Sequence, residues 1–154
     1  MNSIDSRMSI IIGDVWNECV AVAIDVTVLE SLESAQADGE PDLIVELIDL
    51  FLKDAPRRLA NMSTFLEDGD LHSLSREAHC LKGSSATLGA PVMTEICQAV
   101  EDIVRDRPWE IARPLSDLHH EFVRVLEALS AERHNRLVTD SASLNMNPAE
   151  GSAT

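Results

Sequence analysis

The sequence predicts an all-α protein, built as an antiparallel, up-and-down four-helix bundle. Apolar residues recur mostly at helical spacing, aromatic residues are few, and tyrosine is absent. Short connections separate the long amphipathic segments, which favours antiparallel neighbours. A chain of 154 residues is long enough for one domain around a single core.

Residues 1–24 form an extension with two open interpretations. Its apolar residues fit either a helix packed on the bundle or an irregular segment. Asp14 and Glu18 make the apolar stretch too charged to span a bilayer, and no clear signal-peptide cleavage site follows. We therefore expect a cytoplasmic protein without membrane insertion. Whether Met1 or Met8 starts the natural chain is left open.

The first two helices of the folded part have clear boundary residues. Asp25 is a suitable cap for a helix over residues 26–37, which Asp38 and Gly39 would end. Pro41 suits the first turn of the next helix, and Pro56 then marks a kink or a restart. We expect this second helical region to continue until residue 69.

Turn and cap residues also divide the second half of the chain. Gly69 and Asp70 separate the second helical region from a third helix, which Asp70 caps and Gly89 ends. Pro91 starts the fourth helix. Residues 106–113 form a connection with a single turn around Trp109.

The last long helix begins near Pro114, because a proline in its middle would remove a hydrogen bond. Residues 134–154 are polar and rich in Ser, Asn and Ala, which predicts a disordered tail. The bundle domain therefore spans residues 25–133.

Charge and cysteine content exclude several classes of function. The 12 Lys and Arg against 27 Asp and Glu give a formal net charge of −15. Such a surface repels nucleic-acid phosphates and anionic membranes. Cys19, Cys80 and Cys97 are an odd number without C-x-x-C spacing, so neither a disulfide framework nor a zinc site is indicated.

The most informative stretch is residues 78–90, A-H-C-L-K-G-S-S-A-T-L-G-A. At about 100° per residue, one face of this helix gathers within roughly 60° of His79. That face holds His72, Ser75, Arg76, Lys82, Gly83 and Ala86. A separate arc is mostly leucine and predicts the buried side: Leu71, Leu74, Ala78, Leu81, Ser85 and Leu88. Ser84 and Ser85 point away from His79 and suit packing or backbone hydrogen bonds.

The face around His79 suits a phosphoryl group brought by another protein. Gly83 and Ala86 leave little bulk near the imidazole, so a partner can come close. A glycine inside a helix costs up to roughly 1 kcal/mol relative to alanine, and clearance beside His79 would justify that cost. Lys82 and Arg76 supply positive charge, and Ser75 lies on the same face. No acidic residue of this helix shares it.

The stretch resembles the hallmark of histidine-containing phosphotransfer (HPt) domains, H-x-L-K-G-S-[SA]-x-x-[hydrophobic]-G. All its defined positions are matched: His79, Leu81, Lys82, Gly83, Ser84, Ser85, Leu88 and Gly89. The helix pattern extends the resemblance over residues 24–132. The resemblance implies a four-helix bundle with additional short N-terminal helices.

The resemblance also implies a role for His79. Its Nε2 would accept a phosphoryl group from a receiver-domain aspartate and pass it to an aspartate on another receiver, while Lys82 steadies the phosphoryl oxygens. Partners would be receiver domains of a hybrid sensor kinase, a response regulator, or both, and the domain would act as a monomer. It would need no cofactor of its own, with Mg²⁺ on the receiver. Exposed residues of 41–66 would help to dock it.

Alternatives from other classes stay open on the sequence. The chain could be the phosphoacceptor module of a larger chemotaxis-type kinase, although it contains no ATP-site signature. It could be a helical interaction protein in which His79 is incidental. Metal binding by His72, His79, His119 and His120 is disfavoured because no spacing resembles H-E-x-x-H, so we predict no metal site. Hydrolase chemistry is disfavoured because no acid on its helix orients His79. The direction of phosphate flow is not specified.

Overall fold

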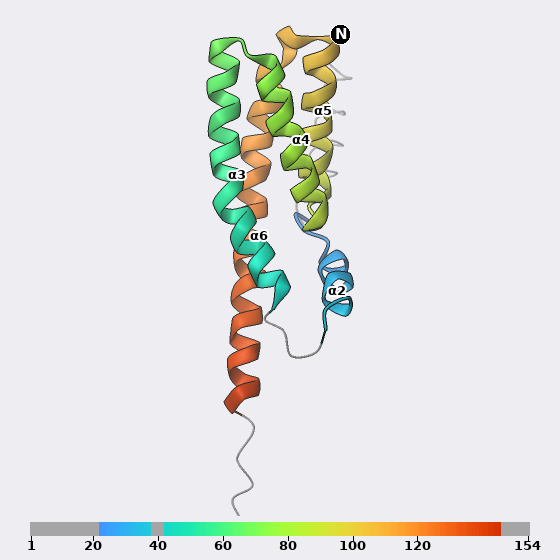
Figure 1. Ribbon diagram of the computed structural model, residues 1–154, viewed down its shortest axis with the longest axis vertical. Coiled ribbons are helices and arrows are strands. Elements are labelled where there is room, and N and C mark those ends of the chain that lie inside the picture. Colours follow the sequence, from blue (N-terminus) through green and yellow to red (C-terminus); the bar gives the residue numbers. More distant parts are fainter. Residues whose placement is uncertain (1–21, 38–41, 146–154) are drawn as a thin grey trace, which may run out of the picture.

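The computed structural model describes residues 22–37 and 42–145. Its helices in chain order are α2 (Val26–Ser34), α3 (Leu43–Asp68), α4 (Leu71–Thr87), α5 (Pro91–Asp106), the 3₁₀ turn η1 (Pro108–Glu110) and α6 (Ala112–Asn145). Figure 1 shows α3 to α6 running up and down side by side, with α2 beside the lower ends of α4 and α5. No strand occurs within these ranges. The predicted all-α, four-helix bundle is confirmed.

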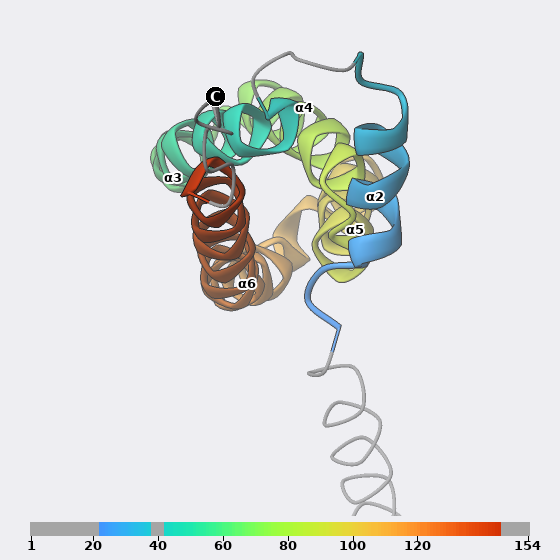
Figure 2. The same cartoon turned by 90° about the horizontal axis from the view of Figure 1, so that it is seen from below.

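The core lies along the axis of the bundle, where the inward faces of all four long helices meet (Figure 2). Each helix contacts the next one along the chain, and α3 also contacts α6, so the ring of helices is closed. The largest fully buried side chains recur at helical spacing along the helices: Leu29, Ile44, Ile48, Met62, Leu74, Leu81, Met93, Cys97, Val100, Leu118, Val125 and Leu129. Helical spacing of apolar residues therefore describes the buried face of the helices.

Three aspartates cap helix N-termini. Asp25 caps α2, and Asp70 caps α4 by accepting from the backbone N–H of Ser73 at 3.0 Å, as predicted. The start of α3 differs from the prediction. Its cap is Asp42 and its first residue is Leu43, so position 41 precedes the helix and lies outside the described residues.

Pro56 does not restart a helix. Helix α3 runs unbroken from Leu43 to Asp68 with Pro56 inside it, and its axis changes direction along its length in Figure 1. Packing of Phe51, Ala55 and Leu59 into the core on both sides of the proline outweighs the one backbone hydrogen bond that the proline removes.

The predicted disordered tail is wrong for residues 134–145, which continue helix α6. Arg136 explains part of this, because it pairs with Glu132 one turn earlier at 2.8 Å and with Glu33 of α2 at 3.2 Å. Arg133 likewise pairs with Asp49 of α3. These charge pairs hold a helix whose apolar stripe has ended. Residues 1–21 of the N-terminal extension, with Met1 and Met8 as its two possible starts, and residues 146–154 lie outside the described residues.

The N-terminal end of α2 packs against the loop between α4 and α5. The backbone N–H of Asp25 donates to the carbonyl of Gly89 at 2.7 Å. Gly89 has φ +70°, and a Cβ built there would lie 2.7 Å from the Asp25 carbonyl and 2.9 Å from the Val28 Cβ. Gly89 follows the end of α4, as predicted. It also lets α2 lie against the turn, which the sequence did not predict.

One carboxylate of α6 gives the fold a pH dependence. Glu121 is 4% exposed and pairs with Arg124 at 2.7 Å, while its Oε1 is buried without a hydrogen-bond partner. Burial raises the pKa of Glu121, and Arg124 opposes that shift. Because its pKa is raised on folding, the folded protein favours the protonated form of Glu121. The free energy of unfolding therefore falls as pH rises and this carboxyl ionises.

We therefore expect Glu121→Gln to stabilise the protein relative to wild type at neutral pH, with a gain that shrinks as pH falls into the ordinary titration range of glutamate. Urea unfolding of both proteins at several pH values measures the difference in free energy of unfolding. A gain that grows on acidification contradicts this account.

Candidate functional site

Helix α4 holds His79 at the surface of a rigid scaffold. Leu74, Ala78, Leu81 and Ser85 are buried on its inner side, whereas the His79 side chain is 67% exposed. Burial on one side fixes the rotation of the helix about its axis, so the imidazole is held outward. The predicted division of this helix into two faces is confirmed.

Gly83 and Ala86 leave an open surface one and two turns after His79. A Cβ built on Gly83 meets no heavy atom within 4 Å, and Ala86 is exposed. Packing inside the protein thus does not require a glycine at position 83. The space beside Gly83 is open on the outer side of the helix, so clearance toward a partner stays a prediction from the sequence.

Lys82 lies against α5 instead of extending freely into solvent. Its Nζ donates to Gln98 Oε1 at 3.0 Å and forms an ion pair with Glu101 Oε1 at 2.8 Å, which leaves its side chain 24% exposed. The contact with Glu101 is ionic and not a directed hydrogen bond, because that oxygen is buried without a hydrogen-bond partner. The lysine is next to His79 as predicted, but it already has partners.

Glu101 is the site residue that sequence reasoning missed. Its Oε2 lies 3.2 Å from His79 Nδ1, so α5 supplies the acid that His79 lacks on its own helix. An ionised carboxylate only accepts hydrogen bonds, so Nδ1 carries the proton and the lone pair is on Nε2. The outer nitrogen is thus the nucleophilic one. Glu101 follows Cys97 and Val100 of the buried stripe, but the register between α4 and α5 that brings it to His79 is not readable from either helix alone.

The other predicted residues of this face are not drawn together around His79. Arg76 lines a shallow cavity of about 160 Å³ between α3 and α4, together with Arg58, Phe65, Ser73, Glu77 and Cys80. Ser75 is half-buried and His72 is exposed. Arg76 forms no hydrogen bond or ion pair with His79, so Lys82 and Glu101 are the charged groups of the immediate site among the described residues.

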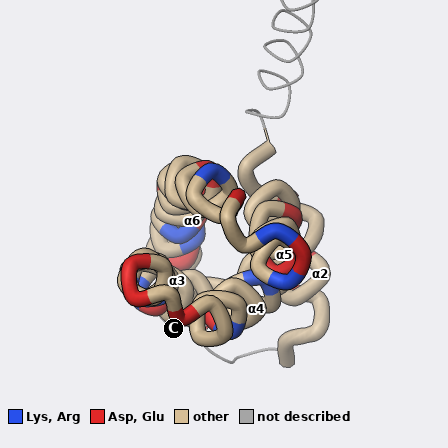
Figure 3. The backbone as a smooth tube through the Cα atoms, turned by 90° about the horizontal axis from the view of Figure 1, so that it is seen from above, with Lys and Arg blue, Asp and Glu red and all other residues tan. Residues whose placement is uncertain are grey.

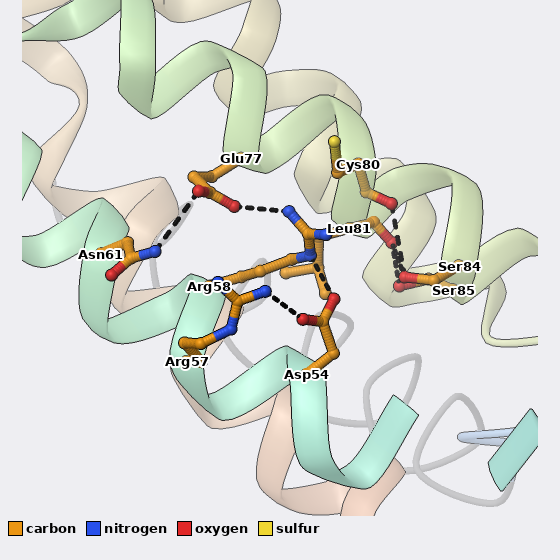
Figure 4. A network of polar contacts seen from close by, with 9 residues as sticks. All are labelled: Asp54, Arg57, Arg58, Asn61, Glu77, Cys80, Leu81, Ser84 and Ser85. Carbon is orange, nitrogen blue, oxygen red and sulfur yellow. Dashed lines mark hydrogen bonds and ion pairs between the residues drawn. The ribbon is translucent and has the colours of Figure 1, made fainter. Parts of the chain in front are cut away.

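A polar network locks α4 onto α3 beside the site (Figure 4). Arg58 joins Asp54 of its own helix to Glu77 of α4, with 2.6 Å between Arg58 Nη1 and Glu77 Oε2. The Arg57 guanidinium, followed by that of Arg58, lowers the pKa of Asp54 against the opposing effect of burial. These pairs restrain sliding of α4, and with it the position of His79.

The two motif serines serve the helix, as predicted. Ser85 Oγ donates to the Leu81 carbonyl at 2.7 Å, and Ser84 Oγ donates to the carbonyls of Leu81 and Cys80 at 3.1 and 3.3 Å (Figure 4). Neither hydroxyl is directed at His79.

An apolar groove lies on the α3 side of the open surface. It has a volume of about 190 Å³ and is lined by Leu47, Leu50, Phe51, Asp54, Ser84, Thr87 and Leu88. Leu50, which borders this groove, is 63% exposed. We call these residues, together with Gly83 and Ala86, the docking face.

The Cys97 thiol of α5 is buried. Burial raises the pKa of Cys97 to about 12, so its thiol stays protonated. No group of three or more His, Cys, Asp or Glu residues in the described ranges could hold a metal ion. None of the helices described is long and apolar enough to cross a bilayer. Seen along the bundle in Figure 3, basic positions lie beside acidic ones on α5, where Arg105 pairs with Asp102 and Asp106.

Comparison with known proteins connects this geometry to a family. Histidine-containing phosphotransfer protein 2 of Arabidopsis thaliana is 29% identical over 82 residues, which cover 51% of this chain and 53% of that protein. The match spans 53%, 27% and 70% of the lengths of the first three curated relatives.

Solved structures agree on the fold. Histidine-containing phosphotransfer protein B from Pseudomonas aeruginosa PAO1 superposes with a TM-score of 0.64 at 29% identity, over 75% of this chain and 97% of that one. The maize histidine-containing phosphotransfer protein ZmHP2 gives a TM-score of 0.67 at 20% identity, over 88% and 99%, which shows a shared fold. The family model described as "Hpt domain" matches residues 46–133, more than half of the chain. This protein therefore belongs to the Hpt domain family.

Proposed function

We propose that the protein is a phosphorelay intermediate. His79 accepts a phosphoryl group from the aspartate of one receiver domain and passes it to the aspartate of another. The observation that carries this proposal is the exposed imidazole whose Nδ1 is held by Glu101 at 3.2 Å, which leaves Nε2 outward and nucleophilic.

The transfer needs no proton movement at His79. The Nε2 lone pair attacks phosphorus, the bond between phosphorus and the aspartate oxygen breaks, and the receiver's aspartate leaves as a carboxylate. Throughout the transfer Nδ1 keeps its proton, which it donates in a hydrogen bond to Glu101. Return transfer to a second receiver reverses these bond changes, and positioning by the rigid α4 supplies the in-line geometry.

The docking face supports a receiver as the partner. Gly83 and Ala86 let another protein approach the imidazole, and the exposed Leu50 borders an apolar groove next to them. The partner would provide the acidic pocket and its Mg²⁺, which neutralises charge on the transferring group. The protein itself acts as a phosphocarrier without a kinase site, as a monomer in the cytoplasm.

A two-receiver relay tests the function. One phosphorylated receiver is mixed with a second, unphosphorylated receiver, with and without a small amount of this protein, and the phosphate on each is followed over time. We expect transfer between receivers only when the protein is present, with an acid-labile label on the protein as the intermediate. Absence of label and of transfer across several receivers supports the helical interaction protein instead.

Gly83→Leu tests whether the glycine provides space for a partner or is only a tolerated weak point of the helix. Leucine is the better helix former by up to ~1 kcal/mol, and the space at position 83 is open, so we expect the free energy of unfolding to rise slightly. Phosphotransfer should fall about tenfold or more, because the new side chain displaces the partner from its in-line position.

Ala131→Leu is the matched control for this substitution, since Ala131 is exposed on α6. Urea unfolding and the initial rate of phosphotransfer are measured for both variants. Unchanged transfer in Gly83→Leu would show that this glycine has no part in docking.

A further inference from the structure

The Glu101 carboxylate, with one negative charge, contacts both the imidazole of His79 and the ammonium of Lys82. Its Oε2 faces His79 Nδ1 at 3.2 Å and its Oε1 faces Lys82 Nζ at 2.8 Å. With a neutral imidazole, Lys82 alone balances the carboxylate. The amide of Gln98 completes the arrangement by accepting from Lys82 at 3.0 Å and donating to Asp102 at 3.1 Å.

Phosphorylation changes the charges around this carboxylate. When Nε2 bonds to phosphorus and Nδ1 keeps its proton, the ring becomes cationic and the phosphoryl group carries close to two negative charges. Glu101 then faces two cations, the ring and Lys82, while a new dianion lies one helical turn from Lys82. The lowest-energy pairing sets the ring against Glu101 and the ammonium against the phosphoryl oxygens.

Resting upon the proposed phosphotransfer at His79, we propose that Glu101 exchanges its ion-pair partner during the reaction, and that Gln98 is the positioning residue that holds Lys82 on α5 until then. The buried Oε1 supports this, because it lies 2.8 Å from the ammonium but accepts no directed hydrogen bond. The hydrogen bond of Lys82 goes to a neutral amide, the partner that a phosphoryl dianion most easily displaces.

Gln98 is the clean probe of this exchange. It is exposed, so its replacement does not disturb the core, and its amide contacts Lys82 and Asp102 but not His79. A change at Glu101, in contrast, alters the hydrogen bond to His79 Nδ1 and the ion pair of Lys82 together. Glu95, exposed one turn earlier on α5, is a matched control position.

The first measurement follows the Gln98 side-chain amide in ¹H–¹⁵N spectra of the full chain, phosphorylated with phosphoramidate so that no receiver is needed. In wild type, phosphorylation should move these amide signals as Lys82 leaves. In Lys82→Met, they should stay in place. Gln98 signals that do not respond in wild type, or that respond equally in Lys82→Met, overturn the exchange.

The second measurement is the phosphoryl equilibrium between His79 and a receiver aspartate. Gln98→Ala removes a contact made only before phosphorylation, so the phosphohistidine fraction relative to aspartyl phosphate should rise about five-fold, the effect of one net hydrogen bond. Glu95→Ala should leave it unchanged. Equal ratios in wild type and Gln98→Ala overturn the inference while leaving the proposed function intact, whereas a wild type that takes no phosphate overturns both.

Discussion

Replacing His79 with glutamine is expected to abolish phosphorylation of the protein by a phosphorylated receiver while leaving its stability unchanged within about 0.5 kcal/mol. The side chain is 67% exposed and packs on no part of the core, so its loss removes chemistry and little packing. Glutamine has no nitrogen lone pair that can attack phosphorus. The loss should therefore be complete and not partial, which makes it the largest effect expected for any single substitution.

His72→Gln is the control for this experiment. His72 is exposed on the same helix and falls on the same face, two turns before His79. Radiolabel on wild type and on His72→Gln, with none on His79→Gln, supports the proposed acceptor. Label remaining on His79→Gln places the acceptor elsewhere.

The largest effect on stability is expected at Gly89. Gly69 and Gly89 both have positive φ, at +71° and +70°, and both end helices. An alanine at either position pays about 1–2 kcal/mol for the left-handed backbone. Only at Gly89 does the new Cβ also meet other atoms, at 2.7 Å from the Asp25 carbonyl, whereas at Gly69 nothing lies within 4 Å.

Gly89→Ala should therefore lower the free energy of unfolding by about 2–4 kcal/mol, and Gly69→Ala by about 1–2 kcal/mol. The additional loss of stability in Gly89→Ala measures the displacement of α2 from its contact with the turn at Gly89. Urea unfolding at neutral pH measures both losses. Equal losses in the two variants would mean that α2 does not press on the turn.

The spacing of apolar residues and the capping residues at helix ends were the features from which the fold could be predicted. Asp25, Asp70, Gly89 and Pro91 marked helix boundaries correctly because capping is local and depends on residues a few positions apart. Local rules left both a kink and a restart open at Pro56, and the choice between them depends on core packing, a tertiary effect that no local rule contains. The predicted end of the last helix was wrong for the same reason.

Much of the site was predictable from one helix, and the rest required the neighbouring one. The exposure of His79 and the clearance at Gly83 follow from helical angles within α4. The partners Glu101 and Gln98 come from α5, whose rotation and register against α4 are set by packing of the whole bundle. The sequence-based argument that His79 lacked an orienting acid was therefore correct for its helix and wrong for the folded protein.

The most direct test is to find the atom that carries the phosphate. The protein is labelled with ¹⁵N, phosphorylated by a receiver, and the ring nitrogens of its histidines are observed by long-range ¹H–¹⁵N correlation. The structure predicts a phosphoryl group on Nε2 of His79, with a proton retained on Nδ1 against Glu101. Phosphate on Nδ1, on another histidine, or on no histidine would contradict the central claim.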